Sequence, residues 1–375
     1  MEKSIIEILS DVPDYRKGNA IRHHLEDILA IGLFSVICNG NTFADMELFG
    51  ETHEETLKNF LELPHGIPSH DTFEEVFAKI DPKELAKIFG VWIEELKDKL
   101  KGTGVSIDGK TIRRSRGKDK KAVHVVTAFA SELQLVLGQL ATDEKSNEIT
   151  AIPKLLEMFC VKGKIITIDA IGAQTEIAQK IKEKEGEYIL ALKANQPDLL
   201  ENVSLYLDQE ICTKSKTKLR ETGWYERTIE QGHGRIETRE CYICPEIDWL
   251  DSRKNWAGLN RIGVIISKRE ETGKVPSIVR HYFLYSMEKT CAAEVLRMKR
   301  SHWAIENQLH WMLDVTFRED DCRARTQNAA ENLNILRKQA LQLMKRDTSS
   351  NRSMRAKRLK CAYDFNYALK VIGLT

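Results

Sequence analysis

Residues 105–108 read Val-Ser-Ile-Asp and residues 164–169 read Lys-Ile-Ile-Thr-Ile-Asp, and these two stretches determine the fold class. Each is a run of β-branched and apolar residues that closes on an aspartate, which predicts a short buried strand. A carboxylate at the end of a buried strand costs solvation free energy unless it is paired or bound to a metal. For one such aspartate, Asp108 or Asp169, a turn or a helix cap is the better explanation. Two in one predicted sheet, the first followed by a basic run, make a shared site an equally good explanation, because open α/β sheets bind ligands at strand ends.

The sequence around these stretches predicts the rest of a sheet. Residues 122–130 and 133–140 are apolar runs that, with 105–108, suggest an antiparallel meander. Residues 150–159 and 174–185 have helical character, and 188–193 reads as a final strand. The order βββαβαβ predicts an α/β fold with a mixed sheet flanked by helices.

The first 100 residues differ from this pattern and predict a helical N-terminal domain. Residues 25–37 form an apolar run typical of a buried helix that ends near Asn39-Gly40. Ser69 can cap a second helix towards Ile80, and Asp81-Pro82 can begin a third that reaches Leu100. Lys-Gly-Thr-Gly at 101–104 is a break, where we expect a domain boundary.

The second half of the chain predicts three further parts. A β-rich insertion spans about 210–285, with strand character at 239–243, 261–267 and 280–285. Helices follow at about 290–313 and 329–345, within a catalytic domain that we expect to cover 101–345. Residues 346–375 are expected to form a basic C-terminal tail.

A third carboxylate stands on the helix predicted at 300–313. Ile305, Leu309 and Met312 share one face of that helix, and His302, Glu306 and His310 form an adjacent stripe at four-residue spacing. Glu306 therefore lies where a carboxylate can meet the sheet. A half-exposed polar stripe is the simpler alternative, and the spacing of the two histidines is not that of a metalloprotease zinc site.

Composition narrows the class of protein without identifying it. The chain is 42% hydrophobic and 30% charged, has a net charge of +1, and contains no run of about 18 apolar residues. Its acidic start does not resemble a secretory signal, so we expect a cytoplasmic protein. Of eight cysteines only Cys241 and Cys244 form a CxxC pair, with no second pair to complete a zinc site. We therefore expect reduced cysteines.

Charge is concentrated locally rather than overall. Segments 110–121 and 345–360 each hold seven lysines and arginines against one aspartate. Such clusters can bind phosphates through counterion release, or they can be solvated surfaces. Three carboxylates with nearby cations suit Mg²⁺ or Mn²⁺, since two such ions can activate an oxygen nucleophile at a phosphodiester.

The sequence resembles a known family, the DDE transposases of bacterial insertion sequences, and within it the H-repeat-associated, Rhs-linked transposases. The resemblance covers nearly the whole chain in order. The matching stretches are Ser106–Thr111, Thr142–Ile149, Gly163–Ala170, His302–Trp311, Glu319–Cys322, Asp14–Lys17 and Phe49–His53.

The resemblance implies an RNase H-like catalytic domain in which Asp108, Asp169 and Glu306 bind two Mg²⁺ or Mn²⁺ ions and are catalytic. Glu319, Asp320 and Asp314 are rivals for the third position. The chain departs from related transposases that carry Tyr, Arg and Lys around the glutamate, since Lys299, His302 and Leu313 occupy those offsets. The DNA contacts that we expect are Lys110, Arg113, Arg114, Arg116, Lys193, Arg300 and His302.

The implied function is that of a bacterial DNA transposase, cytoplasmic and nucleoid-associated when bound to DNA. It would bind double-stranded DNA at terminal inverted repeats, hydrolyse a phosphodiester and join the 3′-hydroxyl to target DNA, as a homodimer and with no membrane partner. Two alternatives stay open: a DNA-binding remnant that has lost transposition, and an RNase H-like nuclease without strand transfer.

Overall fold

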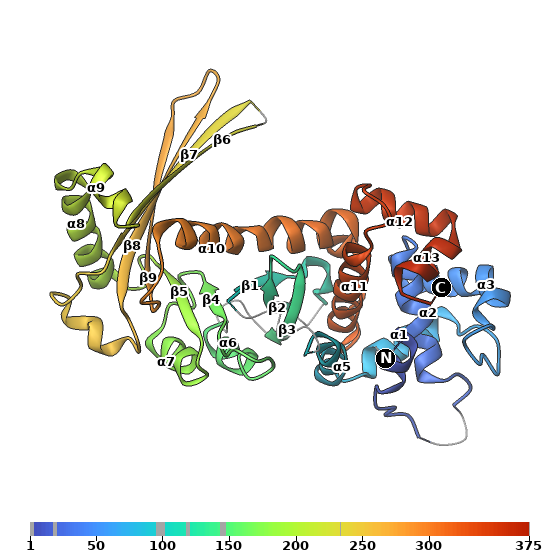
Figure 1. Ribbon diagram of the computed structural model, residues 1–375. Helices are drawn as coiled ribbons and strands as arrows, with labels where there is room; N and C mark the ends of the chain where they lie inside the picture. Colours follow the sequence, from blue (N-terminus) through green and yellow to red (C-terminus); the bar gives the residue numbers. More distant parts are fainter. Residues whose placement is uncertain are drawn as a thin grey trace.

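The computed structural model describes residues 4–17, 21–94, 102–117, 121–142, 148–232 and 234–374, with the backbone alone for 91–94. A sheet forms the middle of the molecule, and a helical region lies at the end where both termini are found (Figure 1). Among the described helices, none combines the length and the apolar character needed to cross a membrane.

The sheet contains nine strands in the order β3-β2-β1-β4-β5-β9-β8-β7-β6. Strands β1 and β2, and β2 and β3, pair antiparallel, whereas β1, β4 and β5 run parallel. This confirms the predicted RNase H-like mixed sheet and its antiparallel meander. The five strands are β1 (Gly104–Thr111), β2 (His124–Ala130), β3 (Leu135–Thr142), β4 (Ile165–Ile168) and β5 (Glu187–Leu192).

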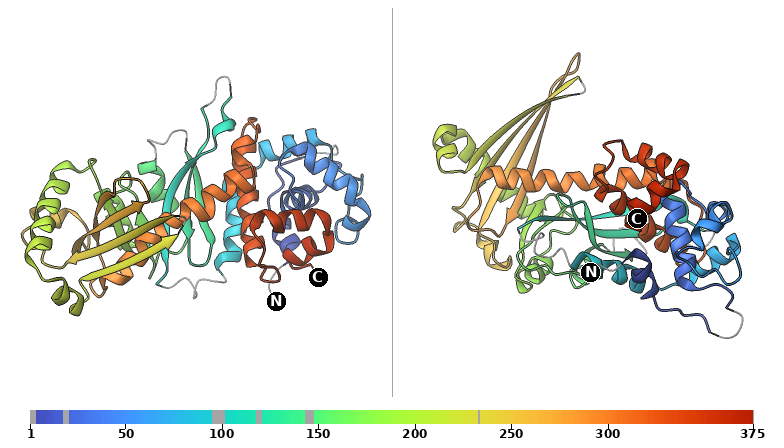
Figure 2. Two further views of the ribbon diagram at one scale, coloured as in Figure 1. Left: turned by 90° about the horizontal axis from the view of Figure 1, so that it is seen from above. Right: turned by 45° about the vertical axis from the view of Figure 1, so that its right-hand side comes forward.

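The insertion extends this sheet instead of forming a separate one, because β9 pairs antiparallel with β5. Its distal part projects as an arm away from the body of the molecule (Figures 1 and 2). Two helices that the sequence did not suggest, α8 (Pro197–Thr213) and α9 (Lys216–Glu221), lead into the arm. Its strands are β6 (Tyr225–Gly232), β7 (Arg235–Cys244), β8 (Arg261–Glu271) and β9 (Ser277–Tyr285).

The two faces of the sheet are covered by different helices. Helices α6 (Glu148–Leu155) and α7 (Thr175–Glu183) pack on one face, where Val105 and Ile107 of β1 are buried. The long helix α10 (Ala292–Ile305) crosses the other face (Figure 1). Since side chains alternate along a strand, Ser106 and Asp108 point towards α10.

The helical region has one core built from both ends of the chain, and the two sets of helices lie side by side (Figure 2). The predicted buried helix is α2, which spans Leu25–Ile37 and has every residue but Glu26 buried. The remaining helices are α1 (Ile5–Ser10), α3 (Phe43–Leu57), α4 (His70–Lys79), α5 (Pro82–Glu94), α11 (Ala329–Arg346), α12 (Met354–Tyr363) and α13 (Phe365–Val371). The part of the third predicted helix from 95 to 100, and residue 101 of the expected boundary, lie outside the described residues.

The expected basic tail, residues 346–375, requires correction, because it folds into α12 and α13 and joins this core. Arg358 is 1% exposed and donates hydrogen bonds to the carbonyls of Val36, Gly40 and Thr316. Lys357 is also buried and donates to the carbonyl of Met344. Basic residues near helix ends can cap carbonyl groups as well as bind phosphates, and sequence alone does not distinguish the two uses.

Candidate functional site

Asp108 and Asp169 lie next to each other at one edge of the parallel strands. The β1–β4 pairing ends at Ile107 and Ile168, so the two aspartates follow at equivalent positions. Ser106 and Thr167, two residues earlier on each strand, bond to α10: the Ser106 hydroxyl donates to the carbonyl of Ser301 at 3.3 Å. Strand alternation therefore directs both carboxylates to the side of the sheet that α10 covers. Strand β1 continues to Thr111, beyond the end predicted at Asp108, because it remains paired with β2.

Glu306 approaches the same region from the end of α10. It opens a π-helical turn, η5 (Glu306–His310), and a second such turn, η6 (Met312–Thr316), follows. In a π-helical turn, backbone hydrogen bonds join residues that are five positions apart, and such turns are frequent at functional sites. The sequence predicted a regular helix here, and hydrophobic periodicity contains no signal for the change.

His310, which the sequence places in the stripe of Glu306 but does not assign as a ligand, lies beside the carboxylates. Its Nδ1 atom lies 3.5 Å from an oxygen of Asp108 and 3.6 Å from an oxygen of Glu306. One ligand atom from each of the three residues falls within 4.8 Å of the others. Around an octahedral ion with bonds of about 2.1 Å, ligand atoms are about 3.0 Å apart when adjacent and about 4.2 Å when opposite. The three residues therefore fit a divalent cation with small adjustments.

The electrostatic environment of Asp108 favours a cation. Burial raises the pKa of Asp108 to about 6; the nearby His310 opposes this rise, and Glu306 and Asp169 add to it. An ion between these groups would relieve the repulsion between the carboxylates.

Asp169 and Glu306 border a pocket of about 230 Å³ together with Asp108. One oxygen of Asp169 accepts a hydrogen bond from the amide of Ile171 at 3.1 Å, which fixes the side chain at the start of the following turn. The other residues that line this pocket are Ala191, Leu192, Lys193, Arg280, His281, Tyr282, Lys299, His302, Trp303 and Ile305. The three predicted acids are thus brought together, and of the expected DNA contacts Lys193 and His302 share their pocket.

Lys110 is not available for DNA, which corrects the expectation from the sequence. Its ammonium lies 2.7 Å from Asp314 and 2.9 Å from Glu319, and its side chain is 10% exposed. Although burial opposes it, the Glu319 and Asp314 carboxylates raise the pKa of Lys110 above its ordinary value. Asp320 belongs to the same network at 3.7 Å, so all three rivals of Glu306 are engaged by this lysine.

His302 also requires correction as a phosphate contact. It is 7% exposed, and its Nδ1 is 3.0 Å from the hydroxyl of Thr167. Burial, with a contribution from Lys299, lowers the pKa of His302 to about 3, so the ring is neutral. It connects α10 to β4 next to Asp169, which is a positioning role.

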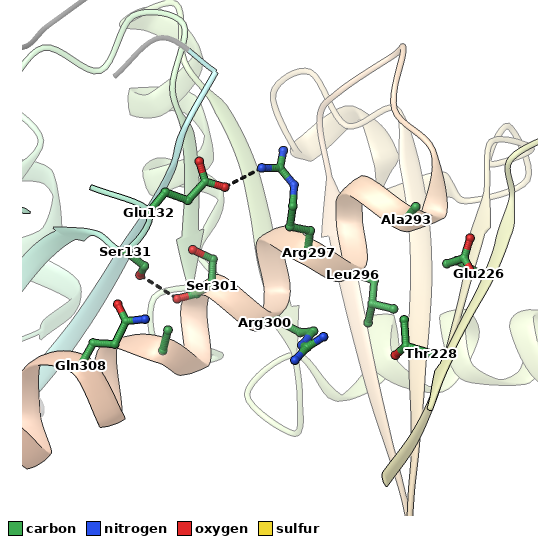
Figure 3. Close-up of a pocket in the computed structure, with 11 residues that line it drawn as sticks. Ser131, Glu132, Glu226, Thr228, Ala293, Leu296, Arg297, Arg300, Ser301 and Gln308 are labelled. Atoms are coloured by element: carbon green, nitrogen blue, oxygen red, sulfur yellow. Dashed lines mark hydrogen bonds and ion pairs between the residues drawn. The ribbon is translucent and has the colours of Figure 1, made fainter. Parts of the chain in front are cut away.

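Arg300 points to a different place, an open groove of about 490 Å³ on another side of α10 (Figure 3). Its guanidinium is 2.5 Å from Glu230 of the arm. In the same groove Arg297 pairs with Glu132 at 2.6 Å, and Ser131 donates to the carbonyl of Ser301 (Figure 3). The structure therefore does not place Arg300 with the carboxylates.

The exposed residues Arg113, Arg114 and Arg116 lie beyond the end of β1, outside the carboxylate pocket. Arg113 pairs with Asp320 at 3.2 Å, and the Arg114 carbonyl accepts a hydrogen bond from Arg325. Lys118 and Lys120 of the same basic segment lie outside the described residues. These arginines form an exposed surface that can bind a polyanion outside the carboxylate pocket.

Cys241 and Cys244 lie three positions apart on β7 and so point to opposite faces of the sheet. Cys241 packs in the core under α10, and Cys244 packs in the core on the other face. Both cysteines are free. The two sulfur atoms of the CxxC motif therefore lie on opposite faces of the sheet.

Two protein families match the chain. The family described as "Transposase DDE domain" matches residues 99–343, and the one described as "DDE_Tnp_1-associated" matches residues 6–93. "H repeat-associated putative transposase YhhI" of Escherichia coli (strain K12) is 38% identical, over 99% of this chain and 98% of its own length. "Putative protein YbfL" of the same strain has the same identity and coverage.

Two further proteins show weaker or partial similarity. "Inactive transposase YbfQ" of Escherichia coli (strain K12) is 39% identical over 20% of this chain and 92% of its own length. The solved structure of a piggyBac transposase synaptic complex with hairpin DNA has a TM-score of 0.44 and 11% identity, and covers 98% of this chain and 77% of that one.

Proposed function

The chain belongs to the family of transposases with a DDE domain, and from this premise we propose that Asp108, Asp169 and Glu306 are its catalytic, metal-binding carboxylates. The observation that carries the proposal is their convergence: two acids at equivalent ends of neighbouring parallel strands and one on the helix that covers them border one pocket. Mg²⁺ or Mn²⁺ fits these oxygen donors, and His310 adds a nitrogen donor beside Asp108 and Glu306.

The proposed reaction is hydrolysis of a phosphodiester at an element end, followed by attack of the released 3′-hydroxyl on target DNA. When bound, two metal ions would supply charge neutralisation at the entering and leaving oxygens. Asp108 is near both Asp169, which follows β4 at the equivalent position, and the Glu306–His310 pair, so it could contribute to holding both ions. His302 holds α10 against β4 through Thr167 and so fixes the distance between Glu306 and the aspartates.

The partners of this reaction are double-stranded DNA with terminal inverted repeats, and a target duplex. We propose a homodimer on DNA, because strand transfer acts on two element ends. The exposed arginines 113, 114 and 116 can contribute phosphate contacts outside the pocket. The alternative function, a DNA-binding remnant, is motivated by the relative named as inactive, although that relative aligns with only 20% of this chain.

A cleavage and joining assay on the DNA that flanks the gene tests the proposal. With Mg²⁺ or Mn²⁺ we expect nicks at element ends and joined products. We expect Asp108→Asn, Asp169→Asn and Glu306→Gln each to reduce nicking by about 100-fold or more, since loss of even an outer partner of a metal ligand costs about 10–100-fold. Asp251→Asn, at an exposed site that does not line the pocket, is the matched control.

The results of the cleavage and joining assay distinguish the candidate functions. Full nicking by Glu306→Gln would refute its assignment, and nicking without joined products would favour an RNase H-like nuclease. Salt-dependent DNA binding without any nicking would favour the remnant.

A further inference from the structure

Strand β6 is one edge of the sheet, and none of the described strands pairs with its outer side. The amide of Ile243 donates a hydrogen bond to the carbonyl of Trp224, so these two opposing residues form a hydrogen-bonded pair. Such pairs alternate with non-bonded pairs along an antiparallel ladder. The residues whose backbone N–H and C=O groups point away from β7 are therefore Tyr225, Arg227, Ile229 and Gln231. An exposed row of backbone groups is a template for another strand.

One face of the arm is apolar next to this edge. Ile229 lies opposite Thr238, and the same row continues through Lys268 to Ile278, so the two isoleucines share a face. Ile236, two residues before Thr238, belongs to this face too. Ile229, Ile236 and Ile278 are 59%, 39% and 58% exposed. We call these three isoleucines the arm patch, and an exposed apolar patch of this kind marks an interaction site.

The opposite face of the arm, towards α10, is polar and its charges are paired. Arg239 lies 2.9 Å from Glu230, and Arg235 lies 2.9 Å from Glu237. Arg300 of α10 also pairs with Glu230. An antiparallel sheet with one covered and one solvated face shows this alternation of apolar and polar side chains. Paired charges on one face and an apolar patch on the other suit a protein partner better than a polyanion.

A second copy of β6 fits this edge in a particular register. Two copies related by a two-fold axis pair antiparallel, and the residue on the axis sets the register. With Arg227 on the axis, two guanidinium groups oppose each other; with Thr228 there, Glu226 opposes Glu230 of the second copy. Like charges directly opposite each other are destabilising. With Ile229 on the axis, no like charges are opposed and two isoleucines meet.

We propose that the chain forms a two-fold symmetric dimer by antiparallel pairing of β6 with β6 of a second copy, centred on Ile229. The outward backbone groups then bond across the axis, and the two arm patches become one. Glu226 and Thr228 line the open groove of about 490 Å³ beside the first half of β6, which leaves room for the end of the second strand (Figure 3). This pairing gives the proposed homodimer a surface, and it rests on the proposed function only for the role of that dimer in joining two ends.

Disulfide trapping tests the register. Opposing residues of a hydrogen-bonded pair have Cα atoms about 5.5 Å apart, which is within the range that a disulfide spans. The background is the full chain with the exposed Cys160 and Cys212 changed by Cys160→Ser and Cys212→Ser. In it, Ile229→Cys should give a covalent dimer when oxidised with copper phenanthroline.

Ile278→Cys is the matched control, because Ile278 has nearly the same exposure and lies on the same face as Ile229. In the proposed dimer it is separated from its counterpart by seven strand spacings of about 4.8 Å, or about 34 Å, so it should give no covalent dimer. Equal yields of covalent dimer from the two variants would contradict the register.

Sedimentation velocity of the full chain without DNA tests the association itself. We expect a dimer at micromolar concentrations. Ile229→Lys places two ammonium groups at the axis and should raise the dimer dissociation constant by about 100-fold or more, because like charges at an interface oppose association. Ile278→Lys should leave the constant unchanged. Both side chains are exposed, so we expect both variants to keep the melting temperature of the unsubstituted protein.

Two results would overturn the arm dimer. One is an unsubstituted chain that stays monomeric, and the other is a dissociation constant that Ile229→Lys does not change. If Ile229→Lys leaves the oligomeric state as it is but strengthens binding of the flanking duplex, the free edge binds DNA instead of a second copy.

Failure of this proposal is distinguishable from failure of the proposed function. A dimer that Ile229→Lys dissociates, in a protein that does not nick DNA with Mg²⁺, would support the arm dimer and refute catalysis. Nicking and joining by a chain without an arm-dependent dimer would refute the arm dimer alone.

Discussion

At the scale of single residues, the Asp108 carboxylate can bind either a proton or a metal ion. The pKa of Asp108 is raised, first by burial, to about 6. A raised pKa means that the folded state prefers the protonated acid, so stability present at low pH is lost as pH rises through about 6. A bound cation reverses that loss, because it interacts with the ionised form.

Metal stabilisation should therefore depend on pH. We expect Mn²⁺ to raise the melting temperature clearly at pH 7.5, where Asp108 is ionised, and less at pH 5, where a proton occupies it. Asp108→Asn should raise the melting temperature of the metal-free protein at pH 7.5. It should also remove the difference between the Mn²⁺-induced shifts in melting temperature at pH 7.5 and pH 5. Equal metal shifts at both pH values in the unsubstituted protein would contradict this assignment.

His310 should make the site prefer manganese. Its Nδ1 faces Asp108 and Glu306, and nitrogen donors favour Mn²⁺ over the strictly oxygen-seeking Mg²⁺. We expect His310→Gln to weaken Mn²⁺ binding, measured by calorimetry, by about tenfold or more, and Mg²⁺ binding by less. His281→Gln, in the same pocket but outside the cluster, is the control; equal losses for both ions would count against a nitrogen ligand.

At the scale of elements, the Lys110 network connects β1 to the segment that follows Glu306. Glu319 is fully buried and bonded to Lys110 and to Asn334 of α11. Lys110→Met would leave Glu319 buried without its nearest cation, so we expect a loss of about 3–5 kcal/mol in the free energy of unfolding. Urea denaturation measures this loss.

Arg113→Gln is the control for that measurement, because Arg113 pairs with the same acidic segment but has a side chain that is 80% exposed. Its loss should cost less than about 1 kcal/mol. Similar losses for both variants would show that the buried network contributes no more than a surface pair.

Gly109 allows β1 to pass close to a buried pair. A Cβ there would lie 2.4 Å from both His124 Nε2 and Glu148 Oε1, and these two atoms are themselves bonded at 2.7 Å. We expect Gly109→Ala to destabilise the protein by about 1–3 kcal/mol, through overpacking, and to weaken metal binding at the adjacent Asp108. Thermal melts and metal titration check both effects, and an unchanged metal affinity would limit the role of Gly109 to stability.

Elements with strong hydrophobic patterns were predictable from the sequence. The helix at 25–37, the strands that lead to Asp108 and Asp169, and the α-helix that leads to Glu306 are confirmed. Helix α8 was missed because its many polar residues give this stretch a composition like that of a loop. The π-helical turns have no signal in the sequence. The partners of Lys110 and the burial of Lys299 depend on residues about 200 positions away and on the course of α10, so local pattern could not reveal them.

At the scale of the whole molecule, the two ends of the chain stabilise each other. Helices α1–α5 and α11–α13 share one core, and Arg358 of α12 caps carbonyls at the end of α2. We expect deletion of residues 348–375 to expose α2 and to abolish its protection from hydrogen exchange, because these buried carbonyls lose their donors. A truncated protein in which α2 keeps full protection would show that the N-terminal helices fold alone.

This shared core has a consequence for the order in which the protein is made. Domains usually fold as they leave the ribosome, N-terminal part first, at about 5–20 residues per second of synthesis. Here the first helices made lack the partners that cover them until helices α11 to α13 have left the ribosome, so this core is completed late in synthesis. A gene copy interrupted before the codons for α11 to α13 would therefore produce a chain with an open apolar core, which proteases and chaperones recognise, instead of a stable DNA-binding fragment.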